Sequence, residues 1–87
     1  MIESRTTRRF REAFAALPED TRRQAKQAYR LFLHDPSHPS RRFKKVDDGA
    51  NIYSIRIGLG YRALGVMTDS AIVWFWIGSH ADYDHLV

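Results

Sequence analysis

Apolar residues recur with a helical period in the first half of the 87-residue chain and with a strand period in the second. Phe10, Phe14 and Leu17 follow one another at helical spacing, while arginines occupy mostly the other positions, which predicts a short amphipathic helix. A second stripe follows Pro18, and the two acidic residues after this proline favour a helix that begins there. This stripe comprises Ala25, Ala28, Tyr29, Phe32 and Leu33.

Beyond Asp35-Pro36 the period of apolar residues becomes two, and the residue before the proline should end the second helix. The polar side chains of Ser54 and Arg56 alternate with apolar neighbours, as in a half-buried strand. A glycine turn at 58–60 joins this strand to an antiparallel neighbour. The expected strands are residues 51–57, 61–67 and 71–77, with shorter ones at 1–5 and 43–46.

The segment 71–77 is apolar almost throughout, which is typical of a central strand covered on both faces. Trp74 and Trp76 should share one face of this strand, where core packing is favoured over stacking on bases. The tail after Gly78 is too short for more than one helical turn. The order of elements predicts an α+β fold, with two N-terminal helices packed on a four- to five-stranded antiparallel sheet in a single domain, residues 1–87.

Composition and charge narrow the class of protein. The chain is 44% hydrophobic and 13% aromatic, which exceeds what a disordered basic tail carries, and the absence of cysteine excludes disulfide scaffolds and thiolate metal sites. No apolar segment approaches the length of a membrane span, so we expect a cytoplasmic protein with no membrane partner. The formal net charge of +4 favours a polyanion or an acidic protein as partner.

Familiar catalytic and cofactor motifs are absent from the sequence. There is no glycine-rich phosphate loop and no nucleophile elbow, and we expect no cofactor. Four possible metal ligands crowd one segment, and His80 and Asp84 could share an ion at i, i+4 spacing. That spacing is generic, so a solvated polar tail is the preferred interpretation of His80, Asp82, Asp84 and His85.

Basic residues on the predicted sheet are better candidates for chemistry. Arg56 lies on the polar face of its strand and Arg62 begins the next strand, so two guanidinium groups could bind one phosphate and stabilise the transition state of its cleavage. His80 is suited to general acid or base catalysis, and Tyr83 could stack on an unpaired base. These residues provide what RNA cleavage by the substrate's own 2′-hydroxyl needs without a metal.

Each candidate also has a structural interpretation. Lys44 and Lys45, just before the sheet, could bind substrate, although a lysine pair is more often plain charged surface. His80 could cap the last strand, and Tyr83 could pack the tail onto the sheet. Instead of phosphate, the two arginines could pair with Asp47, Asp48 or Asp69.

Short motifs in order along the chain resemble those of the RelE/ParE superfamily of bacterial toxins from type II toxin–antitoxin modules. The most specific are Tyr61-Arg62 after the glycine turn and the run IGSHADYD that begins at Ile77. Weaker signals are LP between the helices, DPSHPS after the second helix and KK before the sheet. The resemblance covers nearly the whole chain and implies a fold similar to a small microbial ribonuclease.

The resemblance to RelE-like toxins implies an activity, partners and residue roles. Such toxins enter the ribosomal A site and cut mRNA without a metal, and a cognate antitoxin wraps and blocks them. By position, Arg62 matches an arginine that stabilises the transition state, and Arg56 matches a basic residue that holds the phosphate or moves a proton. His80 falls where relatives carry arginine or histidine, and Tyr83 lies near an aromatic residue that stacks on the substrate.

The chain departs from the family pattern in the middle of the sheet. Ser54 stands where some relatives have lysine, and no glutamate is present there to act as general base, so His80 is the expected base. The basic triad of Arg56, Arg62 and His80 favours RNA as the target, so we expect a ribosome-dependent mRNA endoribonuclease. Two alternatives share the fold, namely a ParE-like inhibitor of DNA gyrase that cuts no RNA and a weakened toxin that acts mainly by binding its antitoxin.

Overall fold

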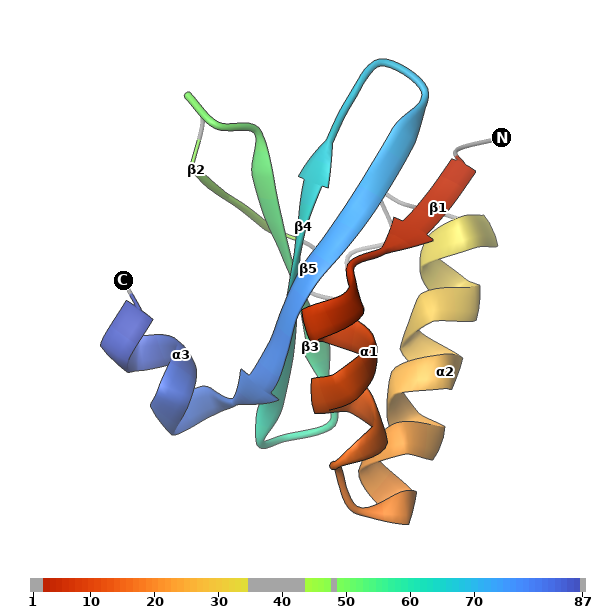
Figure 1. Ribbon diagram of the computed structural model, residues 1–87, viewed down its shortest axis with the longest axis vertical. Coiled ribbons are helices and arrows are strands. Elements are labelled where there is room, and N and C mark those ends of the chain that lie inside the picture. The colour runs from red at the N-terminus through yellow and green to blue at the C-terminus, as the bar shows by residue number, and fades with distance from the viewer. Residues whose placement is uncertain (1–2, 35–43, 48, 87) are drawn as a thin grey trace.

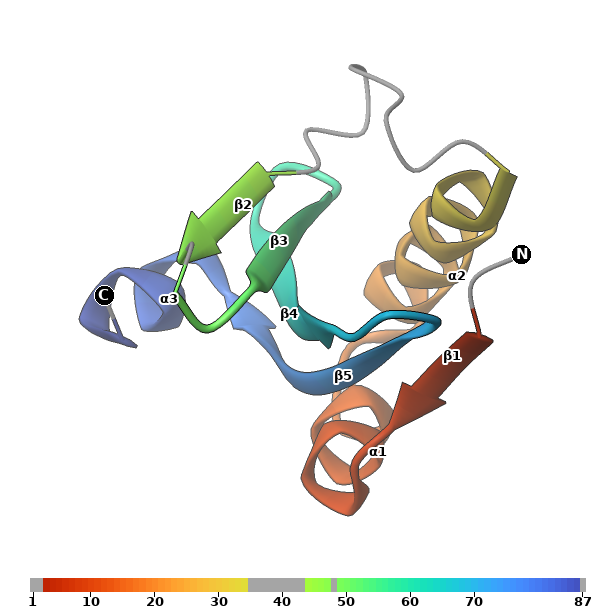
Figure 2. The same ribbon diagram turned by 90° about the horizontal axis from the view of Figure 1, so that it is seen from above.

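The computed structural model describes residues 3–34, 44–47 and 49–86. Within them the elements are β1 (Glu3–Thr6), α1 (Arg8–Ala15), α2 (Glu19–His34), β2 (Lys44–Asp47), β3 (Ile52–Ile57), β4 (Tyr61–Met67), β5 (Ala71–Ser79) and α3 (His80–Leu86). The strands form one sheet in the order β1-β5-β4-β3-β2, and the predicted α+β class is confirmed. The α1 and α2 helices lie on one side of this sheet and α3 lies on the other (Figure 1 and Figure 2).

Local hydrogen bonds explain where the first helix begins and ends. Thr7 caps α1, because its Oγ1 accepts a hydrogen bond from the backbone N–H of Phe10 at 3.1 Å. Arg22 of α2 caps the C-terminal end of α1, since its Nη1 donates to the carbonyl oxygens of Ala15 and Leu17 at 3.2 and 2.6 Å. The described helices include none with the length and apolar character that a bilayer crossing requires.

The core lies between the two N-terminal helices and the sheet. Phe32 is fully buried and meets the indole of Trp74 edge to face, with ring centroids 5.6 Å apart. Gly65 lets Ile72 pack directly on the β4 backbone, because a Cβ at this position would lie 2.8 Å from the isoleucine side chain. The predicted stripes are confirmed for all members but Tyr29, since the core and its partly buried margin include Phe10, Phe14, Leu17, Ala25, Ala28, Phe32 and Leu33.

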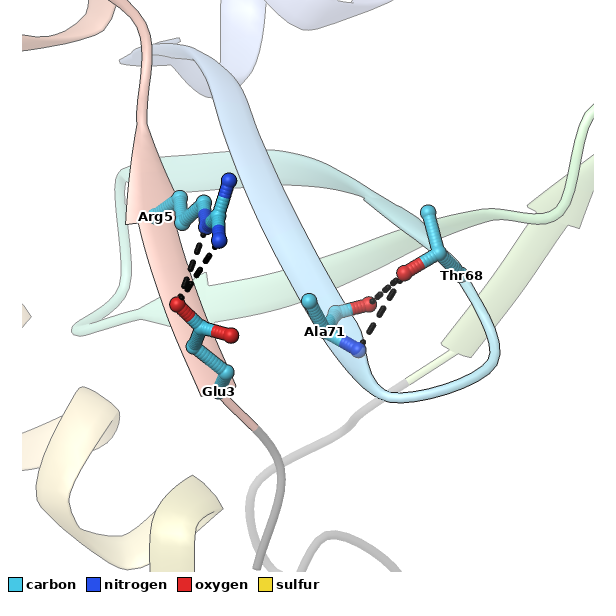
Figure 3. Close-up of polar contacts among 4 residues, drawn as sticks. All are labelled: Glu3, Arg5, Thr68 and Ala71. Carbon is cyan, nitrogen blue, oxygen red and sulfur yellow. Dashed lines mark hydrogen bonds and ion pairs between the residues drawn. The ribbon is translucent and has the colours of Figure 1, made fainter.

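The sheet differs from the prediction at one edge. The β3 and β4 strands are antiparallel to their neighbours as expected, but β1 pairs with β5 in parallel, so the sheet is mixed. No hairpin joins β1 to β5, and the direction of β1 is therefore not forced to be antiparallel by a short turn. Figure 3 shows β1, with the ion pair of Arg5 and Glu3 at 3.0 Å, beside β5. In the turn between β4 and β5, the Thr68 hydroxyl donates to the carbonyl oxygen of Ala71 and accepts from its backbone N–H.

A bulge in β5 separates the two tryptophans. The β4–β5 register pairs Gly65 with Trp74 and Leu64 with Trp76, so β5 contains one extra residue. The predicted shared face is wrong, because Trp74 lies in the core while Trp76 contacts Tyr83 of α3, with ring centroids 6.3 Å apart. The β5 strand is central, as predicted, but its face toward α3 is only partly covered.

The segment after β5 forms a longer helix than predicted. It contains seven residues, whereas the sequence suggested at most one turn. The Ser79 hydroxyl caps α3 by accepting from the backbone N–H of Asp82 at 3.1 Å. The backbone N–H of His80 donates to the Gly60 carbonyl at 2.7 Å. This second bond ties the start of α3 to the β3–β4 turn and so places His80 close to β4.

Candidate active site

The open face, which is the face of the sheet opposite α1 and α2, carries the candidate residues of β4 and α3. Arg56 pairs in register with Arg62, and Ser54 pairs with Leu64, so these positions point away from the core residue Ile55. The α3 helix, which carries His80 and Tyr83, lies on the same side of the sheet (Figure 1).

Arg62 is the centre of a compact cluster on this face. Its Nε donates to Nδ1 of His80 at 3.2 Å, and its Nη1 donates to Oγ of Ser54 at 3.2 Å. The guanidinium carbon lies 5.0 Å from the centroid of the Tyr83 ring, which is a cation–π contact. The His80 ring stacks on the same tyrosine at 6.2 Å between centroids. A fixed cation, a titratable imidazole and an aromatic ring therefore share one surface.

No acidic side chain that the structure describes neutralises the arginine of this cluster. No carboxylate in the described part of the chain forms an ion pair with Arg62, and the alternative pairing with Asp69 is therefore absent. The alternative partners Asp47 and Asp48 have side chains that lie outside the described part of the structure. The nearest carboxylate contact in the cluster belongs to the imidazole, because Nε2 of His80 lies 3.6 Å from Oδ2 of Asp84. Arg62 is consequently available to an incoming anion.

Two residues that the sequence analysis did not assign to the site support the cluster. Ser54 is fully buried, although alternation placed it on a polar face, and its hydroxyl holds the guanidinium of Arg62 against the sheet. Trp76 lies across Gly78, where a Cβ would come within 2.7 Å of the indole, and its ring also meets Tyr83. The bulge in β5 and the length of α3 bring Trp76 to Tyr83, and neither feature has a signal in the hydrophobic pattern.

The remaining predicted site residues lie apart from the cluster or outside the described residues. Although the Arg56 position alternates with the core positions of β3, its side chain lines a separate hollow formed mainly by α2 residues such as Gln24, which Arg62 does not line. No hydrogen bond or ion pair joins the Arg56 side chain to a described residue. The β2–β3 register pairs Lys44 with Ser54, but the side chains of Lys44 and Lys45 lie outside the described part of the structure. Among the residues that are described, no three His, Asp or Glu side chains are grouped closely enough to hold a metal ion.

An apolar groove lies on the other side of the sheet, between α1 and α2. Its volume is about 550 Å³. The side chains of β-strand residues Ile55, Ile57 and Trp74 contribute to it, and Tyr29 of α2 lines it as well. Basic residues line the groove too, namely Arg5, Arg11 and Lys26.

Comparison with known proteins identifies the family. The family model of the ParE-like toxin domain matches residues 19–85, which is most of the chain. The chain belongs to the RelE/ParE superfamily of toxins. The match includes every residue of the Arg62 cluster in this RelE/ParE-type toxin. No curated protein matches the chain significantly.

Solved structures share the fold of this RelE/ParE-type toxin. A chain of the E. coli RelBE toxin–antitoxin complex is 18% identical, with a TM-score of 0.72 over 90% of this chain and 95% of that chain. A chain of the Methanococcus jannaschii RelB–RelE complex is 19% identical, with a TM-score of 0.75 over 95% and 99%. E. coli YafQ is 9% identical, with a TM-score of 0.74 over 95% and 98%. At these identities the similarity shows the fold.

Proposed function

We propose that this RelE/ParE-type toxin inhibits translation by cutting mRNA on the ribosome. The observation that carries the proposal is the cluster on the open face, in which Arg62 is bonded to His80 and packed on Tyr83. These are the residues that the resemblance to RelE-like toxins assigns to catalysis and substrate stacking. A net charge of +4 suits a polyanionic partner such as mRNA or the ribosome.

The proposed reaction is an attack of the RNA 2′-hydroxyl on the adjacent phosphorus. The bond from phosphorus to the 5′ oxygen breaks, which leaves a cyclic phosphate and a 5′-hydroxyl. His80 accepts the proton of the 2′-hydroxyl and returns it to the leaving oxygen. Arg62 stabilises the charge that builds on the phosphate oxygens, and Tyr83 stacks on a base of the strand. No step of this reaction needs a metal ion or a cofactor.

Other basic residues are proposed to bind RNA around the reacting phosphate. Arg56 stands opposite Arg62 in the β3–β4 register, and no described group pairs with its charge. We assign Arg56 to a flanking phosphate, and we assign Lys44 and Lys45 of the adjacent β2 strand to the same strand of substrate.

Primer extension on a defined mRNA tests the proposed reaction. The purified toxin is added to a reconstituted translation reaction and, separately, to the same mRNA without ribosomes. We expect cuts at the A-site codon only when ribosomes are present. Cuts on naked RNA would keep the nuclease and remove the ribosome from the mechanism. If a folded toxin stopped growth without producing any cut, cleavage of mRNA would be the wrong function.

The match to the ParE-like family model favours gyrase inhibition as the second candidate function. A supercoiling assay with purified DNA gyrase distinguishes it from RNA cleavage. Inhibition of supercoiling without RNA cuts would select the gyrase function. If neither activity is present, the chain is a weakened toxin that acts mainly by binding its antitoxin.

We also propose a cognate antitoxin as partner, with the apolar groove as part of its docking surface. The RelBE and RelB–RelE complexes are toxin–antitoxin assemblies and support a partner of this kind. An amphipathic segment would pack its apolar side on the partly exposed apolar side chains of the groove, which are Phe10, Phe14 and Tyr29. Acidic residues on its flank would face Arg11 and Lys26, which complements the basic charge of the toxin.

Charge reversal at the groove tests the antitoxin surface. We expect Lys26→Glu to weaken antitoxin binding about tenfold, because an acidic segment would then meet a like charge. Arg30→Glu is the matched control, since Arg30 is also an exposed α2 residue but does not line the groove. Isothermal titration calorimetry measures both affinities. Equal losses in the two variants would show that net charge, and not the groove, determines binding.

A further inference from the structure

The contact between Arg62 and His80 determines which imidazole nitrogen carries the proton. A guanidinium is always a donor, and Nε of Arg62 lies 3.2 Å from Nδ1 of His80, so Nδ1 accepts and carries no proton. In the neutral ring the proton is then on Nε2, which lies 3.6 Å from Oδ2 of Asp84. Turning the ring over would place carbon atoms opposite both partners and lose both contacts.

We propose that Asp84 is a positioning residue that holds His80 in the Nε2–H form and leaves Nδ1 as the nitrogen that takes the proton in RNA cleavage. This inference rests on the proposed ribonuclease function. The two side chains lie one helical turn apart on α3, and the bond from His80 N–H to the Gly60 carbonyl anchors that turn to the sheet. At 3.6 Å the carboxylate lies within ion-pair distance of Nε2, close enough to favour the proton on that nitrogen and to attract the ring when it is charged.

The arrangement explains how the base becomes available when substrate binds. In the free toxin Arg62 covers Nδ1 of His80. An RNA phosphate that accepts the Nε–H of Arg62 replaces the imidazole and uncovers the Nδ1 lone pair next to the 2′-hydroxyl. As the new O–P bond forms, the 2′ proton moves to Nδ1, and the bond from phosphorus to the 5′ oxygen breaks. The 5′ oxygen then takes the proton, which restores the neutral ring.

Asp84 stabilises the protonated His80 ring that forms between the two proton transfers. The imidazolium carries a proton on each nitrogen, and its Nε2–H faces the carboxylate. The other described groups that face the ring are the Arg62 guanidinium of β4 and the Tyr83 phenol of α3, so Asp84 is the anion among the three. Because 52% of the His80 side chain and 62% of the Asp84 side chain are exposed, we expect a moderate effect on rate rather than the large one seen for buried pairs.

Histidine NMR tests the proton position without any assay of activity. Long-range proton–nitrogen spectra of histidine-labelled toxin at mildly alkaline pH distinguish the two neutral forms, and His80→Gln identifies the His80 signals. We expect the Nε2–H pattern in the wild type and a mixture of forms in Asp84→Asn. Asp82→Asn is the matched control and should retain the wild-type pattern. An Nδ1–H pattern in the wild type, or identical spectra for wild type and Asp84→Asn, would overturn the inference.

Cleavage kinetics on the ribosome test the consequence for catalysis. We expect Asp84→Asn to lower kcat about tenfold with little change in KM, and Asp84→Glu to recover part of the loss. Asp82 lies nearer the N-terminus of α3, so its loss costs the helix at least as much, and Asp82→Asn should nevertheless retain the wild-type rate. Equal rates for the two asparagine variants would contradict a positioning role for Asp84. A wild-type toxin that cuts no RNA would overturn the proposed function, whereas the NMR result would still decide the role of Asp84 in the free protein.

Discussion

Arg62→Ala is expected to lower the rate of mRNA cleavage about a hundred- to a thousandfold, which is the usual effect of removing one fixed donor to transition-state charge. Arg62 is the cation that touches both the imidazole of His80 and the ring of Tyr83, so its loss also removes a contact that orients the proposed base. Single-turnover primer extension on ribosome-bound mRNA measures the rate. Growth inhibition in cells should disappear in parallel.

Two further variants separate charge from geometry in this experiment. Arg62→Lys keeps the charge but cannot bond Ser54 and His80 with one planar fork, so its rate should lie between those of wild type and alanine. Arg9→Ala removes the same charge from an exposed α1 position and should leave the rate unchanged. The alanine variant leaves the buried Ser54 hydroxyl without this partner, which costs about 1–3 kcal/mol of stability, and we expect the fold to remain intact by circular dichroism. A folded Arg62→Ala toxin with full toxicity would refute the proposed site.

Phe32→Ala is expected to lower the free energy of unfolding by about 3–5 kcal/mol. The ring is fully buried between α2 and the sheet and meets Trp74 edge to face, so its removal leaves a cavity in the centre of the core. Because small domains are stable by only about 5–15 kcal/mol, much of the margin would be lost. Urea unfolding followed by circular dichroism measures the change.

Leu31→Ala is the control for this loss of stability. Leu31 precedes Phe32 on the same helix but is 38% exposed, so truncation there should cost much less. If Phe32→Ala does not fold, Phe32→Leu gives a smaller cavity at the same place and keeps the comparison measurable. Similar costs at positions 31 and 32 would mean that the core is not centred on Phe32.

The helices and the central hairpin could be predicted because their signals are local. Pro18 and the acidic pair after it mark the start of α2, and alternation between Ile55 and Ile57 identifies the core face of β3. The parallel pairing of β1 with β5 could not be predicted in this way, since its partners are about seventy residues apart in sequence, as Glu3 and Ala71 illustrate. The hydrophobic pattern also could not predict the side of the sheet on which Trp76 lies, because one extra residue in a strand reverses the alternation of side chains after it.

The residues of the candidate site that the family resemblance named could be predicted from the sequence. The residues that belong to the site only through their three-dimensional contacts could not. Arg62, His80 and Tyr83 were expected from the resemblance and do lie together. Ser54 is buried and accepts a hydrogen bond from Arg62 of the neighbouring strand, and a strand pattern cannot show a contact of this kind. Asp84 lies next to His80 because α3 continues into a second turn, which the sequence did not predict.

The pairing of β1 with β5 bears on the time at which a newly made toxin becomes harmful. During synthesis β1 has no partner until β5 has left the ribosome, and α1 and α2 have no complete sheet on which to fold. His80 and Tyr83 follow β5, so a nascent chain carries Arg62 before it carries the proposed base. The ribosome that makes this toxin therefore meets an incomplete Arg62 cluster while translation continues. A truncated chain that ends within β5 lacks His80 altogether.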